Sequence, residues 1–130
     1  DDYMSKGYVP LREQYDNSVS HALEYYIADF ALSRFAAALG KKKDAEMFYN
    51  RSLGYKHYYS KEFGTFRPIL PDGTFYSPFN PRQGENFEPN PGFHEGSSWN
   101  YTFYVPHDVY GLAKLMGGKK PFIDKLQMVY

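Results

Sequence analysis

Hydrophobic side chains recur at steps of three and four residues in the first half of the chain. Between residues 18 and 39 they form a broad stripe of Val19, Leu23, Tyr26, Ile27, Phe30, Ala31, Phe35, Ala38 and Leu39. This spacing places them on one face of an α-helix. Ser18 or Ser20 can accept a hydrogen bond from the free amides of the first turn, and Gly40 can adopt the left-handed conformation that ends a helix. The pattern predicts a helix over residues 18–39.

A second stripe follows after a short loop, in the sequence KKDAEMFYNRSLGYKHYY. Its members are Ala45, Phe48, Tyr49, Ser52, Leu53, Lys56 and Tyr59. Gly54 disfavours helix near the end of this stretch. Because the connecting loop is short, the two helices should be antiparallel neighbours. We therefore expect a helical hairpin over residues 18–59, with stripes broader than the two helices can cover between them.

Proline and glycine dominate residues 62–105. Six of the nine prolines lie between Pro68 and Pro91. The sequence PDGTF predicts a tight turn that joins two short strands around Phe66 and Phe75. The rest of this excursion has no regular pattern. A loop of this length in a compact domain is usually functional or rests on partners.

Helical periodicity returns over residues 106–129. Pro106 suits the first turn of a helix because its φ is fixed and its amide proton is missing. The following stripe, which ends at Gly117 and Gly118, consists of Val109, Leu112, Leu115 and Met116. Pro121 then opens a second short segment with Phe122, Leu126 and Val129 in register. The chain is therefore predicted to be mainly α, as one segment over residues 1–130.

Composition restricts the classes of partner. Fifteen basic residues balance fifteen acidic ones, so the steering charge that nucleic acid requires is missing. No run approaches about 20 apolar residues, so we expect no membrane span. The aromatic content of 20%, mostly tyrosine, favours surfaces that are apolar and polar at once, as in carbohydrate clefts and wet helix interfaces. The chain begins at Asp1 without a leader pattern, and we expect a processed chain or a piece of a larger protein.

The stretch HEGSSWNYTFYVPHD at residues 94–108 holds two pairs of a histidine and an acidic residue. The pairs are His94 with Glu95 and His107 with Asp108. Their spacing does not match a helical H-E-x-x-H, and the chain has no cysteine for structural zinc. We predict no metal site here and expect Asp108 to favour the positive end of a helix.

Hydrolysis of a glycosidic bond fits the same stretch better, because it needs carboxyl groups and aromatic surface. Glu95 precedes Gly96, so a ligand can approach the backbone, and Phe93 and Trp99 flank it with apolar surface that would favour the protonated acid. A general acid and a surface-loop glutamate both remain open for Glu95. The candidates for a second carboxylate are Glu24, Asp29, Asp72, Glu85, Glu88 and Asp108.

Several blocks occur in the order typical of one family. They are SVSHALEYYIADF, the stretch from AAALGKKKDAEMFYN to TFYSPFNP, and HEGSSWNYTFYVPHDVYGLAKLMGG. Together they resemble glycoside hydrolase family 92, the bacterial exo-acting α-mannosidases. The most specific block is similar to the family pattern E-G-N-A-W-Q-Y-x-x-x-V-P-H-D-V-x-G-L.

This resemblance implies a calcium-dependent enzyme that removes terminal α-linked mannose from glycans with inversion. It implies an N-terminal β-sandwich packed on an (α/α)6-type toroid of helical hairpins, of which this chain would be a segment. Glu95 would be the general acid, and Trp99, His107 and Asp108 would lie near the substrate. Ser97, Ser98 and Asn100 replace the commoner Asn, Ala and Gln of the family pattern.

By the same resemblance, the catalytic base and the calcium ligands would lie beyond Tyr130, and the parent protein would be periplasmic or on the bacterial cell surface. The isolated segment should be inactive and should self-associate through its uncovered stripes.

Two other classes of protein remain open from the sequence. A tetratricopeptide-like scaffold would bind a protein on a concave hairpin surface, although no second copy at the expected period exists. A non-catalytic module would bind sugar by aromatic stacking. If the chain is part of an enzyme, Glu95 and Trp99 should line one pocket with residues of the helix at 18–39.

Overall fold

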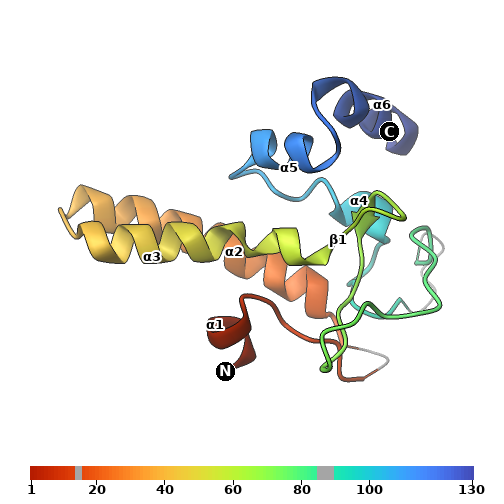
Figure 1. Ribbon diagram of the computed structural model, residues 1–130, viewed down its shortest axis with the longest axis horizontal. Helices are drawn as coiled ribbons and strands as arrows, with labels where there is room; N and C mark the ends of the chain where they lie inside the picture. The colour runs from red at the N-terminus through yellow and green to blue at the C-terminus, as the bar shows by residue number, and fades with distance from the viewer. Residues whose placement is uncertain (14–15, 85–89) are drawn as a thin grey trace.

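Helices dominate the computed structural model of the chain, which describes residues 1–13, 16–84 and 90–130 (Figure 1). The long hairpin consists of α2 (Ser18–Ala38) and α3 (Lys42–Ser52), which run antiparallel and side by side. Gly40 has a φ of 75°, the left-handed conformation expected after the first helix. The predicted hairpin and its connecting turn are confirmed.

The start of α2 is stabilised differently from the prediction. Its N-cap residue is Asn17, whose side chain makes no capping bond. The amides of Val19 and Ser20 donate instead to the carbonyl of Gly92, at 3.0 and 3.1 Å. The predicted serine cap is therefore wrong, because a backbone carbonyl from the excursion occupies the place of the cap. Ser20 Oγ accepts from the amide of His94 at 2.9 Å.

The second helix ends earlier than predicted. A 3₁₀ helix, η1 (Leu53–Tyr58), follows α3 in place of an α-helix that continues to residue 59. Residues three apart on a 3₁₀ helix share a side, and this turns both Tyr55 and Tyr58 into the core. Gly54 permits the close approach, since a Cβ there would lie 2.5 Å from the carbonyl oxygen of Gly7.

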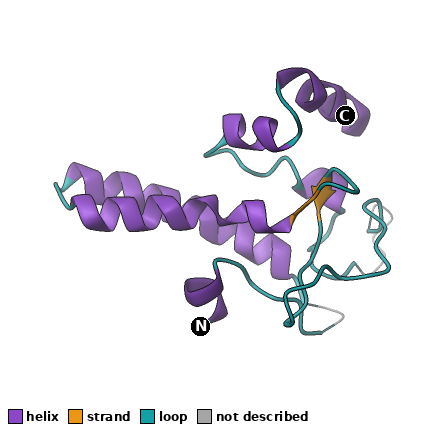
Figure 2. Ribbon diagram, in the orientation of Figure 1, coloured by secondary structure: helices purple, strands orange, loops and turns teal. Residues whose placement is uncertain are grey.

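The excursion contains two local pairings. Strand β1 (Tyr59–Ser60) pairs antiparallel with β2 (Thr65–Phe66), with Tyr59 opposite Phe66 (Figure 2). The predicted turn at PDGTF exists, because the amide of Gly73 donates to the carbonyl of Leu70 at 2.9 Å. However, Phe75 bridges to Ile69 and not to Phe66. The predicted pairing of strands around Phe66 and Phe75 is wrong, since Phe66 is already paired with Tyr59.

Four further helices in the described residues are shorter than α2. They are α1 (Asp2–Lys6), α4 (Ser98–Tyr101), α5 (Val109–Leu115) and α6 (Lys119–Val129). The sequence pattern did not predict α1 and α4. Pro106 was expected in the first turn of a helix, but α5 begins three residues later, with Asp108 as its N-cap. Pro121 lies in the first turn of α6, where its missing amide breaks no helical hydrogen bond.

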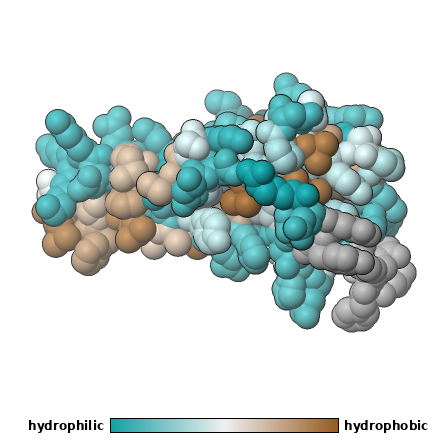
Figure 3. Space-filling view, turned by 90° about the horizontal axis from the view of Figure 1, so that it is seen from below, coloured by the Kyte–Doolittle hydropathy of each residue, from teal (hydrophilic) through white to brown (hydrophobic). Residues whose placement is uncertain are grey.

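The core lies where the base of the hairpin meets the excursion. Its large buried side chains are Leu23, Tyr26, Tyr55, Tyr58, Phe66, Phe93, Val105 and Leu112. Away from the core, apolar side chains remain exposed toward the far end of the hairpin, where brown atoms gather in Figure 3. They include Leu32, Phe35, Leu39 and Met47. None of the described helices is both long enough and apolar enough to cross a membrane.

Candidate active site

Glu95 lines an open pocket of about 400 Å³ between α2 and the segment that precedes α5. Glu24 from α2 lines this pocket together with residues of the segment 95–104, which are Glu95, Gly96, Asn100, Tyr101 and Tyr104. Two carboxyl groups that are far apart in the sequence therefore share one cavity. Such pairs, together with tyrosine hydroxyls and an amide, can bind and protonate a polyhydroxylated ligand.

The backbone at Glu95 has an unusual conformation. Its φ is 50°, the only positive value among the described residues that are not glycine. This conformation is costly for most L-residues and persists when neighbours hold it in place. The hydroxyl of Tyr101 donates to the carbonyl of His94 at 2.6 Å, and the Asn90 amide group donates to the carbonyl of Gly96 at 2.8 Å. The loop is thus fixed on both sides of Glu95.

The side chain of Glu95 is open to solvent. Its exposed fraction is 77%, and its Oε1 lies 3.8 Å from His94 Nε2. The expected apolar enclosure by Phe93 and Trp99 is not found, because Phe93 is buried in the core. Glu95 is therefore presented to a ligand from a rigid loop while most of its own surface faces the pocket and solvent.

The turn after Glu95 is held by the residues that depart from the family pattern. Ser97 Oγ donates to Asn100 Oδ1 at 2.9 Å, and the Ser97 amide reaches the same oxygen at 3.4 Å. Ser98 Oγ donates to the carbonyl of Phe66. The Ser98 bond ties the first turn of α4 to β2, whereas the Ser97 bonds are local, and together they keep a polar network beside Glu95.

Glu24 and Tyr104, which both line the pocket, are joined by a hydrogen bond. The hydroxyl of Tyr104 donates to Glu24 Oε1 at 3.1 Å. Burial and this hydrogen bond raise the pKa of Tyr104 above its usual range. The ring of Tyr104 meets that of Tyr101 edge to face, with centroids 6.5 Å apart. The sequence analysis did not name either tyrosine as a site residue. The available signal was that the two tyrosines follow Glu95 closely and are three residues apart.

Trp99 lies apart from this pocket. The Arg82 Cζ and Lys125 Nζ atoms lie 5.0 and 4.4 Å from the centroid of its ring. Lys125 belongs to α6 and also donates to the carbonyl of Phe63 at 3.3 Å, and burial lowers its pKa. In the described residues Trp99 therefore joins the excursion to α6 through cation–π contacts. Its expected role at the substrate stays a prediction.

His107 and Asp108 connect α5 to the end of the hairpin. His107 Nε2 donates to the carbonyl of Ser52 at 2.8 Å, since a carbonyl can only accept. Asp108 accepts from the hydroxyl of Tyr55 at 2.6 Å and from the amide of Gly111 at 3.1 Å. Asp108 thus lies at the positive end of α5, as expected. Neither residue lines the Glu95 pocket as far as the structure describes it, and their contact with substrate stays a prediction.

Comparison with known proteins identifies the family. The family model of the glycosyl hydrolase family 92 catalytic domain matches residues 1–130. The chain belongs to this family. An inverting family 92 mannosidase from Bacteroides thetaiotaomicron has a similar structure over 96% of this chain, with a TM-score of 0.87 and 35% sequence identity. A family 92 α-mannosidase of the same organism, solved with mannoimidazole, is 32% identical over 98% of the chain, with a TM-score of 0.88.

A further relative is described as an uncharacterized secreted glycosidase of Arthroderma benhamiae, with 24% identity over 98% of the chain. The chain spans only 20% of that protein and 16% and 17% of the two solved family 92 structures. The expected fold class is confirmed, because the mainly helical chain, with its short two-stranded sheet, matches the corresponding part of these enzymes.

Within this family 92 segment, the other candidate carboxylates have structural partners. Asp29 pairs with Arg51 beside α1, Asp72 accepts from Thr74, and Asp108 caps α5. Glu85 and Glu88 lie outside the described residues. Of the candidates that the structure describes, Glu24 is therefore the one that shares the pocket of Glu95. No group of three or more His, Asp or Glu side chains suited to a metal ion occurs in the described residues.

Proposed function

We propose that the protein containing this segment is an inverting exo-α-mannosidase that hydrolyses terminal α-linked mannose from glycans, and that Glu95 is its general acid. The observation that carries the proposal is the family match over residues 1–130, together with 35% identity to an inverting mannosidase at a TM-score of 0.87. The family match also favours an enzyme over a tetratricopeptide-like scaffold or a non-catalytic sugar-binding module.

The geometry of Glu95 supports the acid role. In an inverting hydrolysis one carboxylic acid gives its proton to the leaving oxygen as the bond to the anomeric carbon breaks. A second carboxylate takes a proton from the water that attacks the opposite face of the sugar. The two carboxyl groups are typically about 6.5–9.5 Å apart, which leaves room for this water. Glu95 is held on a fixed loop and lines an open pocket, where a glycosidic oxygen could reach it. We assign the base to the part of the protein that follows Tyr130.

We also propose that the parent enzyme uses calcium, with ligands outside this segment. The described residues do not fit a calcium site on their own, because that ion takes six to eight oxygen ligands and they provide no cluster of three suitable side chains. We propose in addition that the parent is a bacterial protein of the periplasm or cell surface. The similarity to a secreted glycosidase supports an extracytoplasmic location, and the similarity to enzymes of Bacteroides supports a bacterial source.

The test is Glu95→Gln in the full-length parent, which keeps the size of the side chain and removes its proton. General acid catalysis typically contributes about 10²- to 10⁴-fold to a rate. We expect a loss of this size on α-mannobiose, whose leaving group needs protonation, and a much smaller loss on an aryl mannoside with an acidic phenol. Glu46→Gln is the matched control, since Glu46 is an exposed glutamate on α3.

Equal loss of turnover on both substrates would contradict the acid role of Glu95. The stereochemistry is checked separately by proton NMR of the first product formed. Inversion predicts β-mannose, and α-mannose as the first product would rule out the proposed mechanism. Removal of calcium by a chelator should abolish turnover, and full activity of the calcium-free parent would contradict the calcium proposal.

A further inference from the structure

The pocket of Glu95 contains a second carboxylate that the acid step does not use. Glu24 lies in the first half of α2 and lines the cavity together with Glu95. Helix α2 is itself anchored to this loop, because Ser20 Oγ accepts from the His94 amide at 2.9 Å. This side-chain-to-backbone hydrogen bond helps to fix the position of α2 relative to the Glu95 loop.

The orientation of Glu24 is fixed by one neutral donor. The hydroxyl of Tyr104 donates to its Oε1 at 3.1 Å, and among the described residues no lysine, arginine or histidine pairs with this carboxylate. An ionised carboxylate has lone pairs for about four hydrogen bonds. Most of its capacity to accept hydrogen bonds thus remains free on the pocket side.

The surrounding groups define the chemistry of the ligand. The pocket also presents the amide side chain of Asn100 and the edge-to-face pair of Tyr101 and Tyr104. A free carboxylate accepts from hydroxyl donors, an amide both donates and accepts, and aromatic rings pack against C–H groups. This combination fits neighbouring hydroxyls of a sugar ring.

We propose that Glu24 is a specificity-determining residue that binds hydroxyl groups of the mannoside held at Glu95, and that Tyr104 is a positioning residue that orients Glu24. This inference rests on the proposed mannosidase function, because it assigns the ligand of the same pocket. Glu24 accepts hydrogen bonds from the sugar and takes no part in proton transfer. Its loss weakens binding of substrate and transition state alike.

The experiment uses the full-length parent with Glu24→Ala, Glu24→Gln and Tyr104→Phe, and Glu46→Ala as an exposed control. Hydrolysis is measured with aryl α-mannosides that are intact or lack a single hydroxyl. Loss of a hydrogen bond to a charged group typically weakens binding by about 10- to 100-fold. We expect Glu24→Ala to lower kcat/KM by this factor, mainly through KM, on the intact sugar.

The decisive readout is the dependence on each hydroxyl. If Glu24 binds a given hydroxyl, the loss from Glu24→Ala should disappear on the analogue that lacks it, as in a double-mutant cycle. The loss of kcat/KM should be smaller in Glu24→Gln than in Glu24→Ala. Tyr104→Phe should show the same dependence on the hydroxyl, with a smaller loss of kcat/KM. If Glu24→Ala lowers kcat/KM equally on every analogue, as a structural defect would, the inference is overturned. An unchanged KM in Glu24→Ala also overturns it.

Binding of methyl α-mannoside and its monodeoxy analogues is measured by calorimetry in the Glu95→Gln background, so that the result does not depend on turnover. If the parent hydrolyses no mannoside but its sugar affinity depends on Glu24 in a hydroxyl-specific way, the proposed function fails and this inference stands. If hydrolysis requires Glu95 but all analogues respond equally to Glu24→Ala, the inference fails and the proposed function stands.

Discussion

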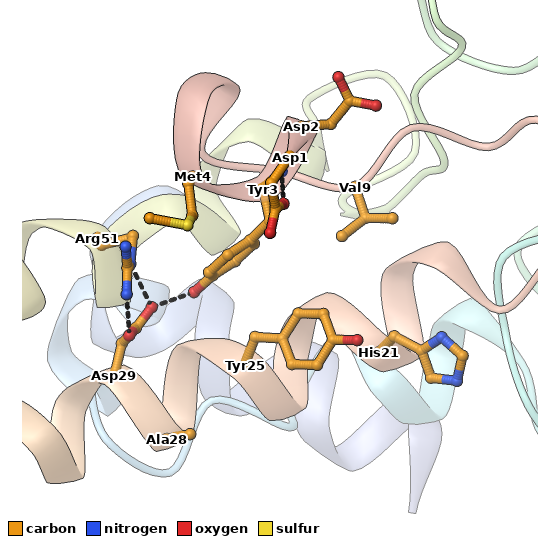
Figure 4. A pocket seen from close by; sticks show the side chains of 10 residues that line it. All are labelled: Asp1, Asp2, Tyr3, Met4, Val9, His21, Tyr25, Ala28, Asp29 and Arg51. Atoms are coloured by element: carbon orange, nitrogen blue, oxygen red, sulfur yellow. Dashed lines mark hydrogen bonds and ion pairs between the residues drawn. The ribbon is translucent and has the colours of Figure 1, made fainter.

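The ion pair between Asp29 and Arg51 joins three helices and allows a quantitative prediction. Arg51 donates through Nε and Nη2 to the two carboxylate oxygens of Asp29, at 2.9 Å each (Figure 4). Tyr3 from α1 donates to the same carboxylate. The side chain of Asp29 is 5% exposed, whereas that of Arg51 is 20% exposed. Both oxygens of a buried charge thus depend largely on Arg51.

Arg51→Met should therefore be more harmful than Asp29→Asn. The first change leaves the buried carboxylate with Tyr3 as its remaining donor among the described residues, and breaking a buried pair in this way costs about 3–5 kcal/mol. Because Arg51 is partly hydrated, we expect about 3 kcal/mol. The second change leaves a guanidinium that can turn to water and an amide that still accepts, so we expect about 1–2 kcal/mol.

Hydrogen exchange in the full-length parent measures this difference locally, which avoids a single unfolding free energy for a multidomain protein. Protection of amides in peptides over residues 42–58 should fall about 100-fold in Arg51→Met, since about 1.4 kcal/mol corresponds to a factor of ten. Lys120→Met removes an exposed pair with Asp124 and should change protection less than about 3-fold. Equal effects of Arg51→Met and Asp29→Asn would refute the reasoning.

Three further changes test the packing around η1 and α5. Gly54→Ala should lower the melting temperature of the parent, because its Cβ would lie 2.5 Å from the Gly7 oxygen and such overpacking typically costs about 1–3 kcal/mol; an unchanged melting temperature would contradict this. Gly111→Ala should also destabilise, by about 1–3 kcal/mol, since its Cβ would lie 2.6 Å from Tyr55 Oη and would displace the Asp108 cap; faster hydrogen exchange in α5 is the readout. Burial, and then the bond to Asp108, raise the pKa of Tyr55 far above its usual range. The neutral Tyr55 hydroxyl therefore contributes fully to stability below the pKa of unfolded tyrosine, about 10. Its contribution decreases as the pH rises above that value. Tyr55→Phe should therefore differ from wild type in melting temperature more at pH 8 than at pH 11, and a difference that grows with pH would exclude this linkage.

Local sequence patterns were sufficient for the hairpin and for the turns marked by glycine. The stripe over residues 18–39 and Gly40 both correspond to local rules of period and backbone conformation. The sequence block around Glu95 was specific enough to indicate the family, and the comparison with known proteins confirmed that family. The same rules were insufficient at the start of α2, because its amides are satisfied by Gly92, a residue remote in the sequence.

By itself, then, the sequence determined the helical hairpin, the position of the PDGTF turn and the resemblance that singled out Glu95. Only the tertiary structure decided that Phe66 pairs with Tyr59, and that Trp99 packs under Lys125 of α6. It also decided which of the candidate carboxylates lines the same pocket as Glu95. Helix period and turn chemistry are encoded by neighbours along the chain, whereas the pocket that Glu24 and Glu95 share depends on how distant segments pack around one core.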